Sequence, residues 1–214
     1  MKAVIFLNGE YRYERKFIQE MIDEEDIVFC ADGGANYAFE YGIVPDYIMG
    51  DLDSIRTDIL HFYEKKDVVI EKYSPEKDYT DFELILHKTG DYEKEGKVTF
   101  EDIYVLGGLG KRIDMTLSNL HLMEEYKNMT FFSENEEIFY REASFSLKNR
   151  KGDEISIIPL GEFVGNLTLK GFKYGTDNVD IERKSSRLVS NIITSDNSRV
   201  EFGKGKIIVV LRKK

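Results

Sequence analysis

The sequence predicts a two-domain α/β protein, with an N-terminal doubly wound, mostly parallel sheet domain followed by a smaller antiparallel β-sandwich domain. Over residues 1–135, short apolar runs rich in β-branched residues alternate with longer helical patterns, the order that yields parallel strands joined by helices. Over residues 136–214, short strand-like runs are separated by turn signals such as G-D, G-N and S-D-N. No helix is needed there, so we expect antiparallel strands.

The individual elements follow from where these patterns lie. Continuous short apolar runs suit strands that are buried on both faces. The strands expected in the first domain are residues 3–7, 27–30, 47–49, 68–70, 103–106 and 129–132. The expected helices are residues 13–22, 35–41, 54–63, 80–87 and 113–126, the last because Ile113, Leu117, Leu120 and Met123 recur at helical spacing. The strands expected in the second domain are residues 145–147, 154–159, 167–169, 188–194 and 207–211.

The composition is that of a globular protein. Hydrophobic residues make up 42% and charged residues 33% of the chain, a balance that excludes disorder and fibrous repeats. The longest apolar runs, such as residues 207–211, are far shorter than the roughly 20 residues that a membrane span needs. We therefore expect no membrane partner. Cys30 is the only cysteine, which agrees with a reducing compartment, and we expect a cytoplasmic protein.

The net charge limits the partners. A formal charge of -10 argues against broad binding of nucleic acid, because such binding needs a dense positive surface. An acidic protein that binds a polyphosphate must supply local cations. These come from Lys or Arg side chains, or from a metal held by carboxylates.

The motif G-D-L-D-S places two carboxylates one residue apart at the end of an expected strand. Asp51 and Asp53 can converge if Leu52 turns away, and Ser54 can then cap the next helix. Ligands bind at this edge of open α/β sheets. Two carboxylates about 4 Å apart repel each other by roughly 4 kcal/mol at an effective dielectric of 20, which a hard cation would relieve. An acidic turn with a helix cap is the alternative for this motif taken alone.

A second acidic pair lies in K-D-Y-T-D. Asp78 and Asp81 are three residues apart at the start of an expected helix, so both can face the same side of its first turn. Carboxylates there also interact favourably with the helix dipole, which is a structural explanation for the pair alone. The combination with Lys77 and with the first acidic pair favours a ligand site. Oxygen ligands without His or Cys suit magnesium rather than zinc.

A glycine-containing motif, A-D-G-G-A-N, follows the strand expected at residues 27–30. Its glycines allow close approach of the backbone to a ligand, and free helical N–H groups can face a phosphate. A tight strand-to-helix turn is the alternative. Asn8 and Gly9, at the end of the first strand, can line the same crevice.

The motif G-G-L-G-K-R-I-D-M-T-L-S-N follows the strand expected at residues 103–106 and leads into a helix. Arg112 and Asn119 lie seven residues apart, so they should share one helix face, opposite to the face of Ile113, Leu117 and Leu120. The helix dipole disfavours a cation at the N-terminal end unless an anion is nearby. Because Arg suits bidentate phosphate binding, this position favours a phosphate contact.

Together and in this order, A-D-G-G-A-N, G-D-L-D-S, K-D-Y-T-D and G-G-L-G-K-R-I-D-M-T-L-S-N, followed by a β domain, resemble the thiamine pyrophosphokinase family. S-N at residues 190–191 and G-F-K-Y at residues 171–174 match more weakly. The resemblance implies transfer of the diphosphate group of ATP to the hydroxyethyl group of thiamine, with release of AMP. It also implies an ATP- and magnesium-binding catalytic domain at 1–135, a thiamine-binding domain at 136–214, and a homodimer with its active site at the interface.

The resemblance further implies roles for single residues. The catalytic residues would be Asp51, Asp53, Asp78, Asp81 and Arg112, of which the four aspartates would bind Mg²⁺. The residues that bind the nucleotide or thiamine would be Asp32, Gly33, Gly34, Lys77, Asp114, Asn119, Ser190 and Asn191.

Three positions depart from the family pattern. Lys111 stands where the family usually has Gly, Met115 where it usually has His, and Gly175 where a Pro commonly follows the Tyr. Two other functions therefore remain as alternatives. One is a non-catalytic module that binds nucleotide or thiamine, and the other is a diphosphotransferase that acts on a different alcohol.

Overall fold

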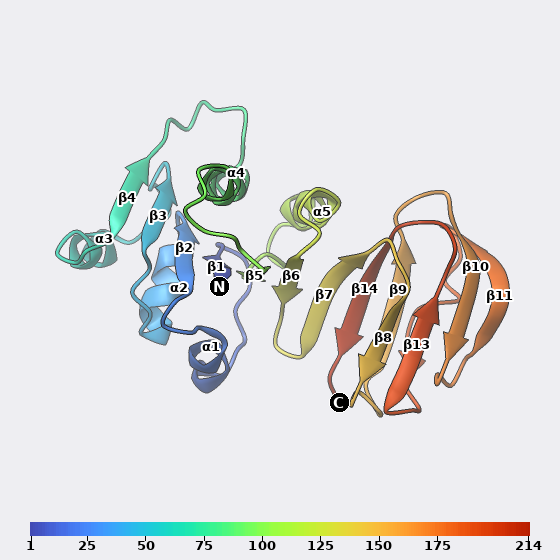
Figure 1. Cartoon of the computed structure of the whole chain (residues 1–214). Helices are drawn as coiled ribbons and strands as arrows, with labels where there is room; N and C mark the ends of the chain where they lie inside the picture. Colours follow the sequence, from blue (N-terminus) through green and yellow to red (C-terminus); the bar gives the residue numbers. More distant parts are fainter. The chain divides into compact units, whose positions relative to one another are not determined.

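A computed structural model describes all residues from 1 to 214 (Figure 1). The chain folds into two compact units. The first consists of Met1–Leu122 and Asn128–Glu134, and the second of Met123–Lys127 and Asn135–Lys214. None of the helices combines the length and the apolar character that crossing a bilayer requires.

The first unit is built on a parallel sheet with the strand order β6-β5-β1-β2-β3-β4. This confirms the predicted parallel sheet. β1 pairs with both β2 and β5, so the order of the strands in the sheet reverses at β1. In open α/β sheets, ligands bind at such a point, outside the carboxyl ends of the strands. The strands are β1 (Lys2–Phe6), β2 (Ile27–Ala31), β3 (Tyr47–Gly50), β4 (Val69–Lys72), β5 (Asp102–Leu106) and β6 (Met129–Phe132).

Helices connect the strands of this sheet. In β1, Ala3, Val4, Ile5 and Phe6 are all fully buried, although successive side chains of a strand point to opposite faces. Burial on both faces explains why the strands read as continuous apolar runs. The helices are α1 (Arg15–Met21), α2 (Gly34–Tyr41), α3 (Thr57–Tyr63), α4 (Asp81–Lys94) and α5 (Ile113–Leu122).

All five helices are found close to their predicted places, but their ends differ from the prediction, and α3 and α5 are two examples. α3 begins at Thr57 and not at Ser54, because Arg56 is its N-cap residue and has extended backbone angles. α5 ends at Leu122 and not at residue 126. The predicted starting point at Ser54 was therefore wrong, and the consequence for the site is described below.

The second unit contains two antiparallel sheets, as predicted. One has the strand order β12-β9-β14-β7 and the other β11-β10-β13-β8. The strands are β7 (Glu136–Arg141), β8 (Phe145–Lys148), β9 (Glu154–Pro159), β10 (Phe163–Lys170), β11 (Thr176–Glu182), β12 (Asn191–Ile192), β13 (Asn197–Glu201) and β14 (Ile207–Arg212).

Three strands of the second unit, β7, β11 and β13, were not predicted, and β12 is much shorter than the strand expected at residues 188–194. β11 lies at the edge of its sheet and buries only Ile181 fully. In β7, the two glutamates at 136–137 precede the buried residues Ile138 to Tyr140. An edge strand that buries one side chain leaves little apolar signal in the sequence.

Candidate active site

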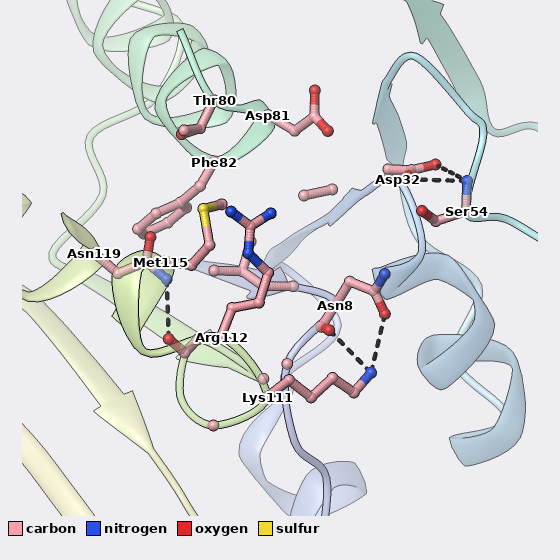
Figure 2. A pocket seen from close by; sticks show the side chains of 16 residues that line it. Asn8, Asp32, Ser54, Thr80, Asp81, Phe82, Lys111, Arg112, Met115 and Asn119 are labelled. Carbon is pink, nitrogen blue, oxygen red and sulfur yellow. Dashed lines mark hydrogen bonds between the residues drawn. The ribbon is translucent and has the colours of Figure 1, made fainter. Parts of the chain in front are cut away.

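A pocket of about 350 Å³ opens at the carboxyl ends of β1, β2 and β5 in the first unit. It is lined by Leu7 to Gly9 after β1, by Ala31 and Asp32 at the end of β2, and by the loop after β5 that runs to Arg112. The pocket therefore lies at the point where the strand order reverses, as expected for a ligand site of this fold. Figure 2 shows the side chains that line it.

Three carboxylates converge beside this pocket. One oxygen from each of Asp32, Asp51 and Asp53 lies within 4.8 Å of the others. Asp32 follows β2, and the other two follow β3, which pairs with β2. The predicted convergence of Asp51 and Asp53 is confirmed, and Asp32 joins them because neighbouring parallel strands end at the same edge.

Local backbone geometry produces this cluster. Leu52 has a φ of 65° and Asp32 a φ of 41°, both in the left-handed region that most side chains avoid. The reversal at Leu52 lets the carboxylates on either side of it face the same way. Gly50, with a φ of 148°, passes so close to Asp32 and Asp81 that an added Cβ would lie 3.0 Å from Asp32 Cβ and 3.1 Å from Asp81 Cγ.

Ser54 holds the cluster together instead of capping α3. Its N–H donates to both Oδ atoms of Asp32 at 3.2 Å (Figure 2). Its Oγ donates to Asp53 Oδ1 at 2.8 Å. The predicted N-cap role was wrong, because the helix starts later and the Ser54 donors are used by the two aspartates.

The surroundings of Asp32 disfavour the ionised form of its carboxyl group. The residue is only 7% exposed, and burial, with a further contribution from the nearby Asp51 charge, raises its pKa above the ordinary value despite the hydrogen bonds from Ser54. Desolvation and a like charge both disfavour the ionised form. A cation bound at the cluster would oppose both effects.

α4 brings a fourth carboxylate to the pocket. The helix begins at Asp81, with Thr80 as N-cap in a capping box with Glu83. The Asp81 side chain packs against Gly50, and its Oδ1 atom is buried without a hydrogen bond. Lys77 Nζ lies 2.7 Å from that same oxygen, so the two form an ion pair without hydrogen-bond geometry.

Asp78 is not brought to the same place. It precedes α4, is exposed, and does not line the pocket. The expectation that Asp78 and Asp81 share the first turn of a helix was wrong, because the capping box at Thr80 sets the start of the helix after Asp78. α4 also continues to Lys94, beyond the predicted end at residue 87.

The opposite wall of the pocket is basic. Arg112 precedes α5, lines the pocket, and extends across it in Figure 2. It pairs with Asp114, with Nη2 2.5 Å from Oδ2, and this pair raises the pKa of the Arg and lowers that of the Asp through a charged hydrogen bond. Its neighbour Lys111 donates to Asn8 and Tyr37.

Asn119 has a structural contact in the pocket wall. It is only 5% exposed, and its Nδ2 donates to the carbonyl oxygen of Gly108 at 2.9 Å. Ile113 and Leu117, in contrast, are 72% and 53% exposed. The predicted orientation of α5 was therefore reversed near its start, because Asn119 anchors the loop after β5 and turns the two apolar residues outward.

The glycines after β2 serve packing within the fold. An added Cβ on Gly33 would lie 2.5 Å from Asn8 Nδ2, and one on Gly34 would lie 2.1 Å from the carbonyl oxygen of Phe6. These close contacts let α2 begin directly against the end of β1. They bring Asn8 and Asp32 to the same pocket.

Ser190 and Asn191 lie in the second unit. Asn191 is only 3% exposed, accepts from the N–H groups of Tyr174 and Ile192, and donates to the carbonyl oxygen of Tyr174. Its amide therefore fixes the backbone of Tyr174, whose side chain is 57% exposed. Ser190 has a φ of 56°, and its N–H donates to Ser156.

Sequence reasoning did not place Asp32 with the acids that it expected to bind a metal, and it did not identify Tyr37 as a contact of Lys111. The position of Asp32 directly after a buried strand could have indicated its place, since Asp51 follows the next strand. The contact of Tyr37 with Lys111 spans 74 positions and leaves no local signal.

Family models match both parts of the chain. Residues 18–132 match the model described as "Thiamin pyrophosphokinase, catalytic domain". Residues 142–207 match "Thiamin pyrophosphokinase, vitamin B1 binding domain". The two matches occur in the order that the sequence predicts.

Individual proteins are similar over most of the chain. Thiamine pyrophosphokinase of Bacillus subtilis is 29% identical over 194 residues, which cover 88% of each protein. Thiamine pyrophosphokinase 1 of Oryza sativa subsp. japonica is 26% identical over 224 residues, covering 92% of this chain and 82% of the relative.

Solved structures share the fold. The thiamine pyrophosphokinase of Bacillus subtilis superposes with a TM-score of 0.85 at 24% identity, with both chains fully covered. That of Geobacillus thermodenitrificans gives a TM-score of 0.84 at 23% identity, covering 100% of this chain and 98% of the other. Since the catalytic-domain model alone matches more than half of the sequence, this chain belongs to the thiamin pyrophosphokinase family.

Proposed function

We propose that the chain is a magnesium-dependent thiamine pyrophosphokinase that transfers the diphosphate group of ATP to the hydroxyethyl group of thiamine, giving thiamine diphosphate and AMP. Membership in the family supports the reaction. The observation that carries the proposal is a single pocket with carboxylates on one side and Lys and Arg on the other. Such a pocket suits a triphosphate and its counter-ion.

The acidic side fits Mg²⁺. Asp32, Asp51 and Asp53 offer oxygen atoms alone, which Mg²⁺ prefers. The buried Oδ1 of Asp81 has only the Lys77 ion pair as a partner, and burial together with the nearby Asp51 charge raises the pKa of Asp32, so a bound cation would stabilise both carboxylates. We assign these four residues to the metal site. Asp78, one of the four aspartates that the sequence predicts for this site, stays a prediction.

Bound Mg²⁺ would neutralise phosphate charge and hold the triphosphate against the aspartates. The chain itself supplies the remaining requirements of phosphoryl transfer, which are positioning and fixed charge. Arg112 extends across the pocket, and its planar guanidinium suits bidentate contact with phosphate oxygens. Lys77 stands beside Asp81 and would contact phosphate on the acidic side.

We propose the ranges 1–135 for the ATP-binding domain and 136–214 for the thiamine-binding domain, which the two matched models support. Thiamine would contact the second domain near Ser190 and Asn191. Because Asn191 is used to fix Tyr174, we assign it a positioning role there. We also propose a homodimer in the cytoplasm, and a monomer mass by light scattering would contradict the dimer.

The test is an assay of AMP release. Purified protein with ATP, magnesium and thiamine should produce AMP and thiamine diphosphate, and omission of either thiamine or magnesium should abolish both. Asp81→Ala should lose nearly all activity while its circular dichroism spectrum stays that of the wild type.

Two outcomes would favour other functions. ATP binding without AMP formation would indicate a non-catalytic binding module. AMP formation with another alcohol but not with thiamine would indicate a different diphosphotransferase. No feature of the structure specifically favours either of these two alternative functions.

A further inference from the structure

Lys111 has an unusual backbone conformation at the rim of the pocket. Its φ is 52°, in the left-handed region where an L residue is strained and Gly is not. Gly107 and Gly110, in the same loop, also have positive φ values. A residue that holds a strained conformation at a functional site suggests a role for its side chain.

The side chain of Lys111 is fixed by neutral acceptors. Its ammonium donates to the Asn8 carbonyl oxygen at 3.0 Å and to Asn8 Oδ1 at 3.3 Å (Figure 2). It also donates to Tyr37 Oη at 2.7 Å. It also lies 4.9 Å from the centre of the Tyr37 ring. These contacts use all three ammonium hydrogens and keep the charge beside the pocket that Lys111 and Asn8 both line.

An aromatic stack holds this arrangement in place. The Tyr37 ring stacks on Tyr11 with the ring centres 4.0 Å apart and the planes 9° apart. Tyr11 in turn donates to the carbonyl oxygens of Leu7 and Leu106, at the ends of β1 and β5. Lys111 is therefore tied to the edge of the sheet where the strand order reverses.

The charge of Lys111 is not compensated. The other two cations near the site each face a carboxylate, since Lys77 pairs with Asp81 and Arg112 with Asp114. Lys111 pairs with none, in a chain that has 40 acidic and 30 basic residues. An exposed cation without a carboxylate partner, aligned with a pocket, attracts an anion.

We propose that Lys111 is an additional polyphosphate-binding residue of this chain, which makes the pocket bind nucleoside triphosphate more strongly than nucleoside monophosphate. This inference rests on the proposed function, because it takes ATP as the occupant. A fixed positive charge gains more from the triphosphate than from the single phosphate of AMP. Lys111 would then help to retain ATP and to release the product.

The test is isothermal titration calorimetry with ATP or AMP in the presence of magnesium and in the absence of thiamine. Lys111→Met should bind ATP about tenfold more weakly, because one fixed positive charge beside the triphosphate is lost, and AMP less than about twofold more weakly. Lys111→Arg should retain most of the ATP affinity. The difference between wild type and Lys111→Met should shrink at high salt, because salt screens exposed charges.

Lys65→Met is the matched control. Lys65 is exposed, lies in the same unit and does not line the pocket, so its loss changes the net charge equally and should leave both affinities unchanged. The inference is overturned if Lys111→Met binds ATP as wild type does. Equal losses for ATP and AMP would overturn it too, since they would indicate a general effect on pocket shape.

Lys111→Gly separates binding from folding. Glycine adopts a φ of 52° without strain, so the thermal unfolding midpoint should stay the same or rise while the ATP affinity falls. A fall in both would overturn the inference. The proposed function fails separately, if wild-type protein binds ATP but releases no AMP with thiamine.

Discussion

The two ends of β2 carry two aspartates that differ sharply although both are buried. Asp26 at the amino end is 9% exposed and Asp32 at the carboxyl end is 7% exposed. Asp26 accepts from the backbone N–H groups of Lys2 and Asp23, and Lys2 Nζ lies 3.1 Å from its Oδ2. Asp32 faces two further carboxylates and accepts only from Ser54 and the local backbone.

The pKa values of the two residues move in opposite directions. Burial opposes ionisation of Asp26, but the hydrogen bonds from Asp23 and Lys2 and the Lys2 charge outweigh it, so the pKa is lowered. For Asp32, burial outweighs the hydrogen bonds, and the pKa is raised. The fold thus uses one aspartate to stabilise itself and keeps the other in an unfavourable state. A loss of stability of this kind, at the edge of the sheet where ligands bind, is typical of a functional site.

The largest expected effect distinguishes the two ends by activity. Asp32→Asn should lower the rate of AMP formation by about 10²–10³-fold, since charge stabilisation at a metal site is worth several kcal/mol. Asp26→Asn should leave the rate per folded molecule nearly unchanged, because Asp26 lies at the opposite edge of the sheet. Steady-state assays on both variants with thiamine, ATP and magnesium measure this difference.

Magnesium titrations serve as the control. If Asp32 binds the metal, Asp32→Asn should need more magnesium for half-maximal activity, whereas Asp26→Asn should need the wild-type amount. Full activity of Asp32→Asn at the wild-type magnesium concentration would remove Asp32 from the proposed metal site.

A smaller effect is expected on stability, where Asp26→Asn and not Asp32→Asn should be the more harmful substitution. Asp26→Asn should lower the free energy of unfolding by about 1–3 kcal/mol, because a buried N–H loses its acceptor and Lys2 loses a charged partner. Asp32→Asn should raise it by about 1 kcal/mol in the absence of magnesium, since it removes a like charge from the cluster. Urea denaturation of both variants measures the two changes.

A destabilised Asp32→Asn would break the comparison, because it would show that the Asp32 charge contributes to the fold. Ser54→Ala checks the interpretation. It removes the hydroxyl that donates to Asp53 but keeps the backbone N–H that donates to Asp32, so it should change stability less than Asp26→Asn does.

The parallel sheet and its carboxyl edge could be predicted because burial on both faces leaves short but continuous apolar runs in the sequence. The edge strand β11 of the second unit could not be predicted, since it buries little more than Ile181. β7 was not predicted either, although Ile138 to Tyr140 are buried, because its apolar run is short and follows two glutamates.

The site could be predicted only in part, because it depends on contacts between distant segments. Asp51 and Asp53 are close in the sequence and were found by their spacing. The inclusion of Asp32 depends on β2 lying next to β3, and the direction of Asn119 depends on its bond to Gly108. Neither contact leaves a periodic pattern.

The smallest expected effect is the pH at which each aspartate stops influencing stability. Because the pKa of Asp32 is raised above 3.8 in the folded state, the native state binds more protons than the unfolded state just above pH 3.8, and stability falls as pH rises through this window. The stability advantage of Asp32→Asn over wild type should therefore shrink as the pH falls through the raised pKa.

The pKa of Asp26 is lowered below 3.8, so its contribution to stability is present above pH 3.8 and is lost only as the pH falls through the lower value. Urea midpoints measured from pH 7 downward should show the Asp32→Asn difference closing at a higher pH than the Asp26→Asn difference. If both close at the same pH, the two ends of β2 do not differ in the way that their hydrogen bonds and burial indicate.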